Sequence, residues 1–143
     1  MIQNLKLQIE LVPSTAWGHN LRKLMKPFMW QAIRNEVLEK ARGTCMICEA
    51  SGTLDCHEVW AYDDQNHIQK LAGFLALCKD CHDIKHIGFA SLSHGRPKYE
   101  KLVNHFIKVN KCSRADFVEH YNKAMEVFRE RSKWDWEMDL KDI

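Results

Sequence analysis

Hydrophobic and polar residues alternate along residues 2–12, with an apolar side chain at every second position. A period of two is typical of a strand with one buried face, and a proline is expected to end it. The predicted buried face consists of Leu5, Leu7, Ile9 and Leu11. The pattern therefore predicts an N-terminal strand that stops at Pro13, followed by a loop over residues 15–25.

A helical period begins at Pro27, a residue that suits the first position of a helix. Apolar residues then recur three or four positions apart, which gives the stripe of a helix that packs on a core. The stripe consists of Trp30, Ile33, Val37 and Ala41. Gly43 is expected to end this helix, because glycine readily adopts the left-handed conformation that follows a helix.

Two strands are predicted next, at residues 53–60 and 74–77, with a polar loop over residues 63–67 between them. A short helix should follow Cys81, reach about Ile87 and end at Gly88. His82 and His86 are four residues apart in it, so their side chains are expected to project from the same face.

Two longer helices are expected after a loop over residues 88–97. The first, over residues 98–109, has one apolar face and a polar face formed by Lys98, Lys101, His105 and Lys108. Ser113 and Asp116 have the spacing of a capping box, which predicts the start of the second helix. Trp134 and Trp136 predict a tail that packs back on the body. The mixture of strands and helices predicts an α+β fold.

Length and composition narrow the class of protein. A chain of 143 residues is expected to form one domain, with its core at about 43–88 and a helical extension at about 97–143. The net charge is only +2, so any affinity for nucleic acid must come from local basic clusters. No apolar run approaches the roughly 20 residues that cross a membrane, and the first residues do not resemble a signal peptide. These features predict a cytoplasmic protein with no membrane partner.

Two cysteine pairs stand out, Cys45-x-x-Cys48 and Cys78-x-x-Cys81. Each such turn presents two sulfur ligands at one apex, and two turns complete a tetrahedral site. In the reducing cytoplasm this spacing favours metal binding over disulfide bonds. The sequence therefore predicts a structural zinc ion on these residues. The alternatives are a disulfide framework or four buried thiols without a metal.

Three histidines are candidates for chemistry. Hydrolysis of a phosphodiester needs a base that activates water and a cation that stabilises charge on the leaving oxygen. His57 lies late in the first predicted strand of the pair, opposite the helix that carries His82 and His86. We expect the strand imidazole to face an ion held by the helix imidazoles. Histidines at helical spacing also occur on protein surfaces without any metal.

The segment over residues 43–88 resembles the HNH, or ββα-metal, endonucleases in their zinc-bound form. The resemblance is carried by the two cysteine pairs, by Cys56-His57-Glu58, and by Cys81-His82-x-x-Lys85-His86. It implies that His57 is the general base and that Cys56, His82 and His86 hold one divalent ion, Mg²⁺, Mn²⁺, Zn²⁺ or Ni²⁺. It also implies cleavage of DNA to 5′-phosphate and 3′-hydroxyl ends.

Two positions depart from the family pattern. The residue before the base is usually Asp or His, and Cys56 takes its place here; a thiolate favours zinc or another soft ion over magnesium. The asparagine that orients the base should lie about five residues before Cys78, where this chain has Gly73. Asn66 is the nearest asparagine in the loop, at a different offset.

Basic side chains suggest where DNA could bind. Lys98, Lys101 and Lys108 form a stripe that could follow a phosphate backbone, and Arg96 could reach the scissile phosphate. The alternative for the stripe is an ordinary solvated helix face. For the whole chain, the alternatives are a degenerate HNH module that binds nucleic acid or a protein without cutting, and a plain zinc-stabilised interaction domain.

Overall fold

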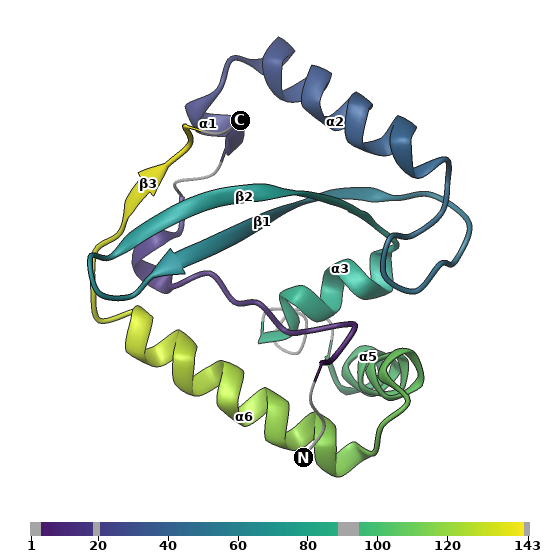
Figure 1. The fold of residues 1–143 in the computed structure, drawn as a ribbon. Helices are drawn as coiled ribbons and strands as arrows, with labels where there is room; N and C mark the ends of the chain where they lie inside the picture. The colour runs from purple at the N-terminus through teal and green to yellow at the C-terminus, as the bar shows by residue number, and fades with distance from the viewer. Residues whose placement is uncertain (1–3, 19–20, 89–94, 142–143) are drawn as a thin grey trace.

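The computed structural model describes residues 4–18, 21–88 and 95–141 of the chain, without the side chain of Arg22. The fold is α+β and combines a small sheet with several helices (Figure 1). The elements in chain order are η1 Ser14–Ala16, α1 Leu21–Leu24, α2 Pro27–Ala41, β1 Asp55–Asp63, β2 Ile68–Leu77, α3 Lys79–Lys85, α5 Gly95–Asn110, α6 Arg114–Arg131 and β3 Glu137–Asp139. Most of the predicted loop over residues 88–97, including Ser91, Ser93 and His94, lies outside the described residues.

A long antiparallel hairpin, β1 with β2, crosses the middle of the molecule. His57 lies opposite Leu75, and the register shifts between Val59 and Trp60. Both strands are longer than the predicted ranges, because the ladder continues through polar positions to a tight turn at residues 64–67. Figure 1 shows α2 on one side of the hairpin and α3, α5 and α6 on the other.

The predicted N-terminal strand is wrong as secondary structure, although its burial pattern is correct. Leu7 and Ile9 are buried as the alternation implied. The described part of this segment has no regular secondary structure and pairs with no strand. Its backbone bonds to side chains instead: the N–H of Leu7 donates to Oδ1 of Asn110 at 2.8 Å, and Nδ2 of Asn110 donates to the carbonyl of Leu7 at 2.9 Å. The side chain of Asn110 thus takes the place of a neighbouring strand.

The same segment is tied to α3. The N–H of Glu10 donates to the carbonyl of Lys85, and the ammonium of Lys85 lies 2.6 Å from a carboxylate oxygen of Glu10. Lys85 is only 3% exposed. Because a buried ammonium without a partner is strongly unfavourable, this pair fixes the segment at the end of α3.

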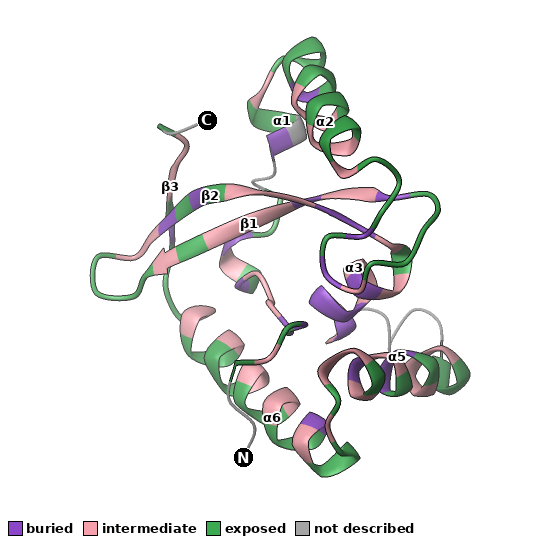
Figure 2. Cartoon of the chain, turned by 45° about the vertical axis from the view of Figure 1, so that its right-hand side comes forward, coloured by how far each residue is buried: buried purple, intermediate pink, exposed green. Residues whose placement is uncertain are grey.

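The main core lies between α3, α5, α6, the N-terminal segment and one face of the hairpin. Figure 2 shows α3, rich in buried residues, between the hairpin and α5. Among its fully buried members are Leu7, Ile84, Ile87, Leu102 and Phe106. A smaller cluster of Leu21, Trp30 and Leu71 joins α1 and α2 to the opposite face of the hairpin.

Several helix predictions are confirmed. Helix α2 begins at Pro27, and its backbone turns left-handed at Arg42, one residue before the predicted stop at Gly43. The capping box of Ser113 and Asp116 opens α6. The predicted loop over 15–25 instead contains η1 and α1, and α5 begins three residues earlier than expected, at Gly95. Among the described residues, no helix combines the length and apolar character that a bilayer crossing requires.

The C-terminal tail packs back on the body as expected, and it does so partly as a strand. Trp136 is buried, and its indole N–H donates to the carbonyl of Arg131 at 2.9 Å. Trp134 stays about half exposed and stacks on His67, with the ring centroids 4.4 Å apart. Strand β3 then runs parallel to β2, which no sequence pattern had indicated.

We expect Asn110→Ala to destabilise the protein, because it leaves the buried N–H and C=O groups of Leu7 without partners. Loss of the two bonds should lower the free energy of unfolding by about 2 kcal/mol, measured by urea unfolding with zinc present. Asn104→Ala, at an exposed position of the same helix, is the matched control and should change it by less than about 0.5 kcal/mol. Equal effects of the two substitutions would contradict the role given to Asn110.

Candidate metal centres

The four paired cysteines meet at one point. Their sulfur atoms all lie within 4.8 Å of one another, close enough to bind a single metal ion. Cys45 and Cys48 lie in the turn after α2, while Cys78 caps the N-terminus of α3 and Cys81 lies in its first turn. None of the chain's cysteines is in a disulfide bond, so the disulfide framework is excluded in this structure.

Backbone hydrogen bonds hold the first cysteine turn against the hairpin. The N–H of Cys45 donates to the carbonyl of Ala50 at 2.9 Å, and the N–H of Met46 donates to the carbonyl of Ala76 in β2 at 3.0 Å. In the second turn the N–H of Cys81 donates to the sulfur of Cys78 at 3.4 Å. The two turns therefore hold their sulfurs together by local backbone structure.

The thiols carry the electrostatic signature of a cation site. Burial raises the pKa of Cys78 to about 11, and burial with the neighbouring charges of Cys45 and Cys78 raises the pKa of Cys81 further. Burial also opposes ionisation of Cys45, yet backbone hydrogen bonds in the two turns lower its pKa to about 7. One thiolate can therefore form readily, but four can coexist only if a cation neutralises their repulsion.

A residue missed by sequence reasoning, His105, lies beside this centre. Its Nε2 atom is 3.2 Å from the sulfur of Cys81. Groups that donate to ligand atoms orient metal ligands. The sequence predicted that His105 lies on the polar face of a helix, but nothing in it indicated that this helix packs beside the cysteines.

Two lysines of the basic stripe on α5 form ion pairs with acidic residues of α3. The ammonium of Lys98 lies 3.0 Å from Asp83, and that of Lys101 lies 3.5 Å from Asp80. These charges are therefore already paired within the protein. Lys108 and Arg96 are exposed on the same helix.

Loss of one cysteine sulfur should remove the ion from the four-cysteine centre and unfold the surrounding segment. We expect Cys78→Ser to contain about one zinc ion fewer per chain and to lose its cooperative thermal transition, because metal binding here is coupled to folding. Zinc content by atomic emission and melting by circular dichroism measure both effects. Cys112→Ser, outside the cluster, is the control, and a Cys78→Ser protein that kept its ion and its melt would refute the assignment.

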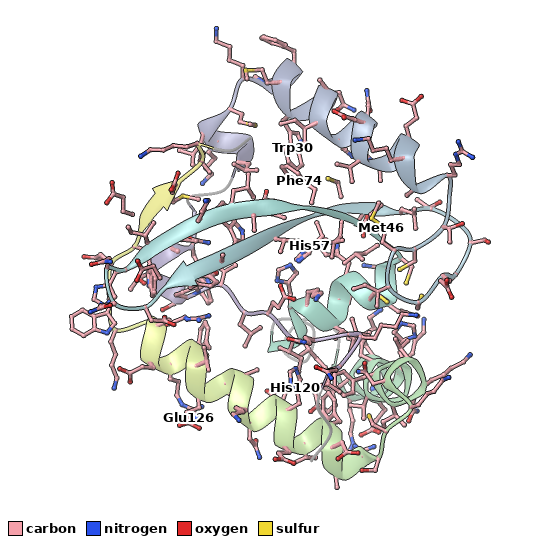
Figure 3. All side chains as sticks on the ribbon, viewed as in Figure 1. Trp30, Met46, His57, Phe74, His120 and Glu126 are labelled. Atoms are coloured by element: carbon pink, nitrogen blue, oxygen red, sulfur yellow. The ribbon has the colours of Figure 1, made fainter. Side chains whose placement is uncertain are left out.

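A second centre lies farther along α3 from these thiols, where three histidines converge. The ring nitrogens of His57, His82 and His86 that face one another all lie within 4.8 Å, and the ring centroids are 5.3–5.4 Å apart. His57 comes from β1, His82 from α3 and His86 from the residue that ends α3. Figure 3 shows His57 on the side of the hairpin that faces α3. The structure thus brings together the three histidines that the sequence singled out.

The protonation state and hydrogen bonding of the three imidazoles favour binding of a cation. Burial, with the nearby His86 and His82 as further causes, lowers the pKa of His57 to about 3, and burial lowers the pKa of His86 to about 4. Both imidazoles are therefore neutral near pH 7, the state in which histidine binds metal. The Nε2 atom of His57 is buried and has no hydrogen-bond partner within the described structure. Such an orphaned nitrogen is expected where a ligand or ion is to be bound.

Cys56, expected as a ligand of the same ion, does not join this cluster. It is adjacent to His57 in a strand, so its side chain leaves the opposite face, and it packs against the cluster of Trp30 and Leu71. Figure 3 shows Trp30 and Phe74 on that side of the hairpin, away from His57. The expectation for Cys56 is therefore wrong, because the alternation of a strand separates neighbouring residues.

Asp55, rather than Cys56, is the residue before His57 on β1 that contacts the three histidines, and it does so through His82. It lies two residues before His57, on the same face of β1, and its Oδ2 atom is 3.1 Å from Nδ1 of His82. A carboxylate at Nδ1 leaves Nε2 of His82 as the nitrogen that can bind an ion, and it fixes the orientation of the ring. The period of two along the strand was the signal that could have identified it.

Asn66 and its neighbours in the hairpin turn make contacts that do not involve His57. Asn66 donates from its backbone and side-chain nitrogens to the carboxylate of Asp63, which closes the hairpin turn. Asp64 forms a two-pronged pair with Arg131 of α6. Gly73 lies within β2 opposite Val59, and it has no side chain to orient the base. The structure provides no asparagine brace for His57 at either position.

A cleft of about 620 Å³ opens beside the three histidines, and we call it the histidine cleft. One wall is β1, the edge strand of the sheet, and another is the N-terminal segment over residues 8–12. Further lining comes from Trp30 of α2 and from residues of α6, which are His120, Lys123, Ala124, Val127 and Arg131. Any group that reaches the three histidines from solvent can enter through this cleft.

Comparisons with known proteins found no relative: no family model, no curated protein and no solved structure matches the chain. The site geometry therefore carries the functional argument alone.

We expect Asp55→Asn to weaken metal binding at the three histidines by about 10- to 100-fold, because the carboxylate that orients His82 is lost. Titration of the zinc-replete protein with Co²⁺, followed by its visible absorption, measures this affinity. The matched control is Asp63→Asn on the same strand, which touches only the hairpin turn. An affinity unchanged in the Asp55 variant would show that the carboxylate does not support the site.

Proposed function

We propose that this protein is a metal-dependent endonuclease of the HNH, or ββα-metal, kind that hydrolyses phosphodiester bonds in DNA. The observation that carries the proposal is the convergence of His57 from a hairpin with His82 and His86 from the helix that follows it. A base and cation ligands in contact with one another are the parts such hydrolysis needs.

In this proposal His57 accepts a proton from the attacking water. Its Nε2 atom carries no hydrogen bond, and it is neutral near pH 7 because burial holds its pKa at about 3. That pKa makes it a weak base in the free protein, and an incoming phosphate anion would raise it. His82 and His86 hold a divalent ion, with Asp55 orienting His82 through Nδ1. When bound, the ion stabilises negative charge on the phosphate and on the departing 3′ oxygen.

The four-cysteine centre has a structural role in the proposal. Four thiolates in a tetrahedral cluster are the usual ligand set of a structural zinc ion. The centre lies at the N-terminus of α3, the helix that carries His82. A zinc ion there would hold α3 against the hairpin and so keep His82 and His86 opposite His57.

Fewer basic residues of α5 are free to contact DNA than the sequence suggested. Lys98 and Lys101 are paired with Asp83 and Asp80, so they contribute less attraction for phosphate than free lysines would. Arg96 and Lys108 remain exposed and stay in the proposal as DNA contacts.

The second candidate function is a degenerate HNH module that binds nucleic acid without cutting it. Two observations favour it: no asparagine occupies the position of Gly73, and Cys56 points away from the three histidines. A general base without support for its ring would act poorly. This candidate predicts salt-sensitive binding of DNA with no metal-dependent cleavage.

The test is cleavage of supercoiled plasmid with Mg²⁺, Mn²⁺, Zn²⁺ or Ni²⁺ supplied. We expect His57→Ala to lower the rate by about 10²- to 10⁴-fold, the range for removal of a general base. His67→Ala, a histidine at the far end of the same hairpin, should cut at the rate of the natural chain.

Metal content then separates the two roles that His57 could have. A His57→Ala protein that keeps the second ion but does not cut supports a base, whereas loss of that ion would make His57 a third ligand. Cleavage by the natural chain that chelators do not reduce, or equal cleavage by His57→Ala, would refute the proposal. No cleavage with any ion would favour the binding module.

A further inference from the structure

The size of the histidine cleft restricts the substrate that can reach the three histidines. His57 is only 5% exposed, so a reacting phosphate has to enter the cleft rather than touch an outer surface. A volume of about 620 Å³ lies within the range of roughly 300–1,000 Å³ found for pockets that bind small molecules. A space of this size can hold a nucleotide or two of a single strand, but not the width of a double helix.

The lysine and arginine that line the cleft lie on α6, while its carboxylates are Glu10, which is paired with Lys85, and Glu58 of β1. Arg131 lines the cleft, but its guanidinium is bound to Asp64 and lies over the ring of Tyr62. Lys123, about two turns before Arg131 on the same helix, is exposed and also lines the cleft. It has no ion pair with any residue that the structure describes, so its ammonium is available to a phosphate.

The β1 and N-terminal sides of the cleft contribute aromatic and apolar surface. Trp60 lines the cleft at the edge of β1, where it is half-buried against the cluster of Trp30 and Leu71 on the other face of the hairpin from His57. Leu11 and the exposed Val127 contribute further apolar surface from the N-terminal segment and α6. Such surface suits the flat face of a base but offers nothing to the phosphates of an intact duplex. Aromatic side chains beside a basic group are the features that bind single-stranded nucleic acid.

We propose that the histidine cleft binds an unpaired stretch of nucleic acid, with Lys123 on a backbone phosphate and Trp60 stacked on a base. The inference rests on the proposed function and adds to it the class of substrate: single-stranded or locally unpaired nucleic acid rather than duplex. The nucleic acid then crosses the edge of β1, from Trp60 on one face of the hairpin to the three histidines and Lys123 on the other.

The experiment measures binding by fluorescence anisotropy, with the natural chain and no added divalent ion. The probes are a labelled DNA oligonucleotide of 12 nucleotides, the length being about that of one single-strand site, and the same oligonucleotide annealed to its complement. We expect the single strand to bind at least about 10-fold tighter than the duplex, because only the single strand exposes base faces.

Variants identify the contacts. Lys123→Gln should weaken single-strand binding by about fivefold and lower the slope of log K against log salt by about 0.7, the value for one phosphate contact. Trp60→Leu should weaken it by about 10-fold through loss of stacking. Lys40→Gln on α2, an exposed lysine outside the cleft lining, is the matched control and should change neither quantity. Thermal melting checks that each variant is folded. If Trp60→Leu does not fold, Lys123→Gln alone tests the proposal, because Lys123 is exposed and its substitution should not affect folding.

Each outcome has a separate meaning. Duplex bound as tightly as single strand, or Lys123→Gln without effect, overturns the inference, even if the protein cuts plasmid with metal. Single-strand preference that depends on Lys123, without any metal-dependent cutting, supports the cleft assignment and overturns the proposed nuclease. A chain that neither binds nor cuts nucleic acid overturns both.

Discussion

The rest of the structure depends on the meeting of four thiols at the start of α3. Burial and the charge of neighbouring sulfurs keep most of them from ionising alone, so the cluster is stable as a ligand set only around a cation. The two turns that form it come from the end of α2 and from the end of β2, which are separated by the whole hairpin. Closing the cluster therefore closes the hairpin and fixes the position of α3. His82 lies in α3 and His86 directly follows it, so the thiol cluster also determines where the second centre can form.

The second centre is held from other directions as well. Asp55 reaches His82 from β1, and the buried pair of Lys85 with Glu10 ties the end of α3 to the N-terminal segment. That segment separates the hairpin from α6 and supplies a wall of the histidine cleft. One short helix thus has four clustered thiols at its beginning, three histidines beside it, and a buried ion pair at its end. Its position is set by contacts that come from most of the chain.

The basic stripe of α5 was the expected DNA contact, but part of its charge is paired within the protein. Lys98 and Lys101 of α5 form ion pairs with acidic residues of α3 and so help to pack the two helices together. The basic group that remains available near the histidines is on α6, a helix that gave no reason for attention in the sequence. A count of basic residues on a helix face therefore said little about substrate contact, because the partner of each residue depends on which helix packs beside it.

The sequence by itself determined the parts whose signals are local. Cysteine spacing, the period of α2, and the capping box of α6 each arise from neighbouring residues, and each was predicted. The spacing of His82 and His86 on one helix was similarly readable. Tertiary structure decided the rest. An alternating segment looks like a strand whether its backbone meets another strand or, as here, the side chain of Asn110, because alternation reports burial and not the hydrogen-bond partner. Likewise, the choice of Asp55 over Cys56 beside the histidines depended on which face of β1 meets α3, and only the packing of distant elements sets that face.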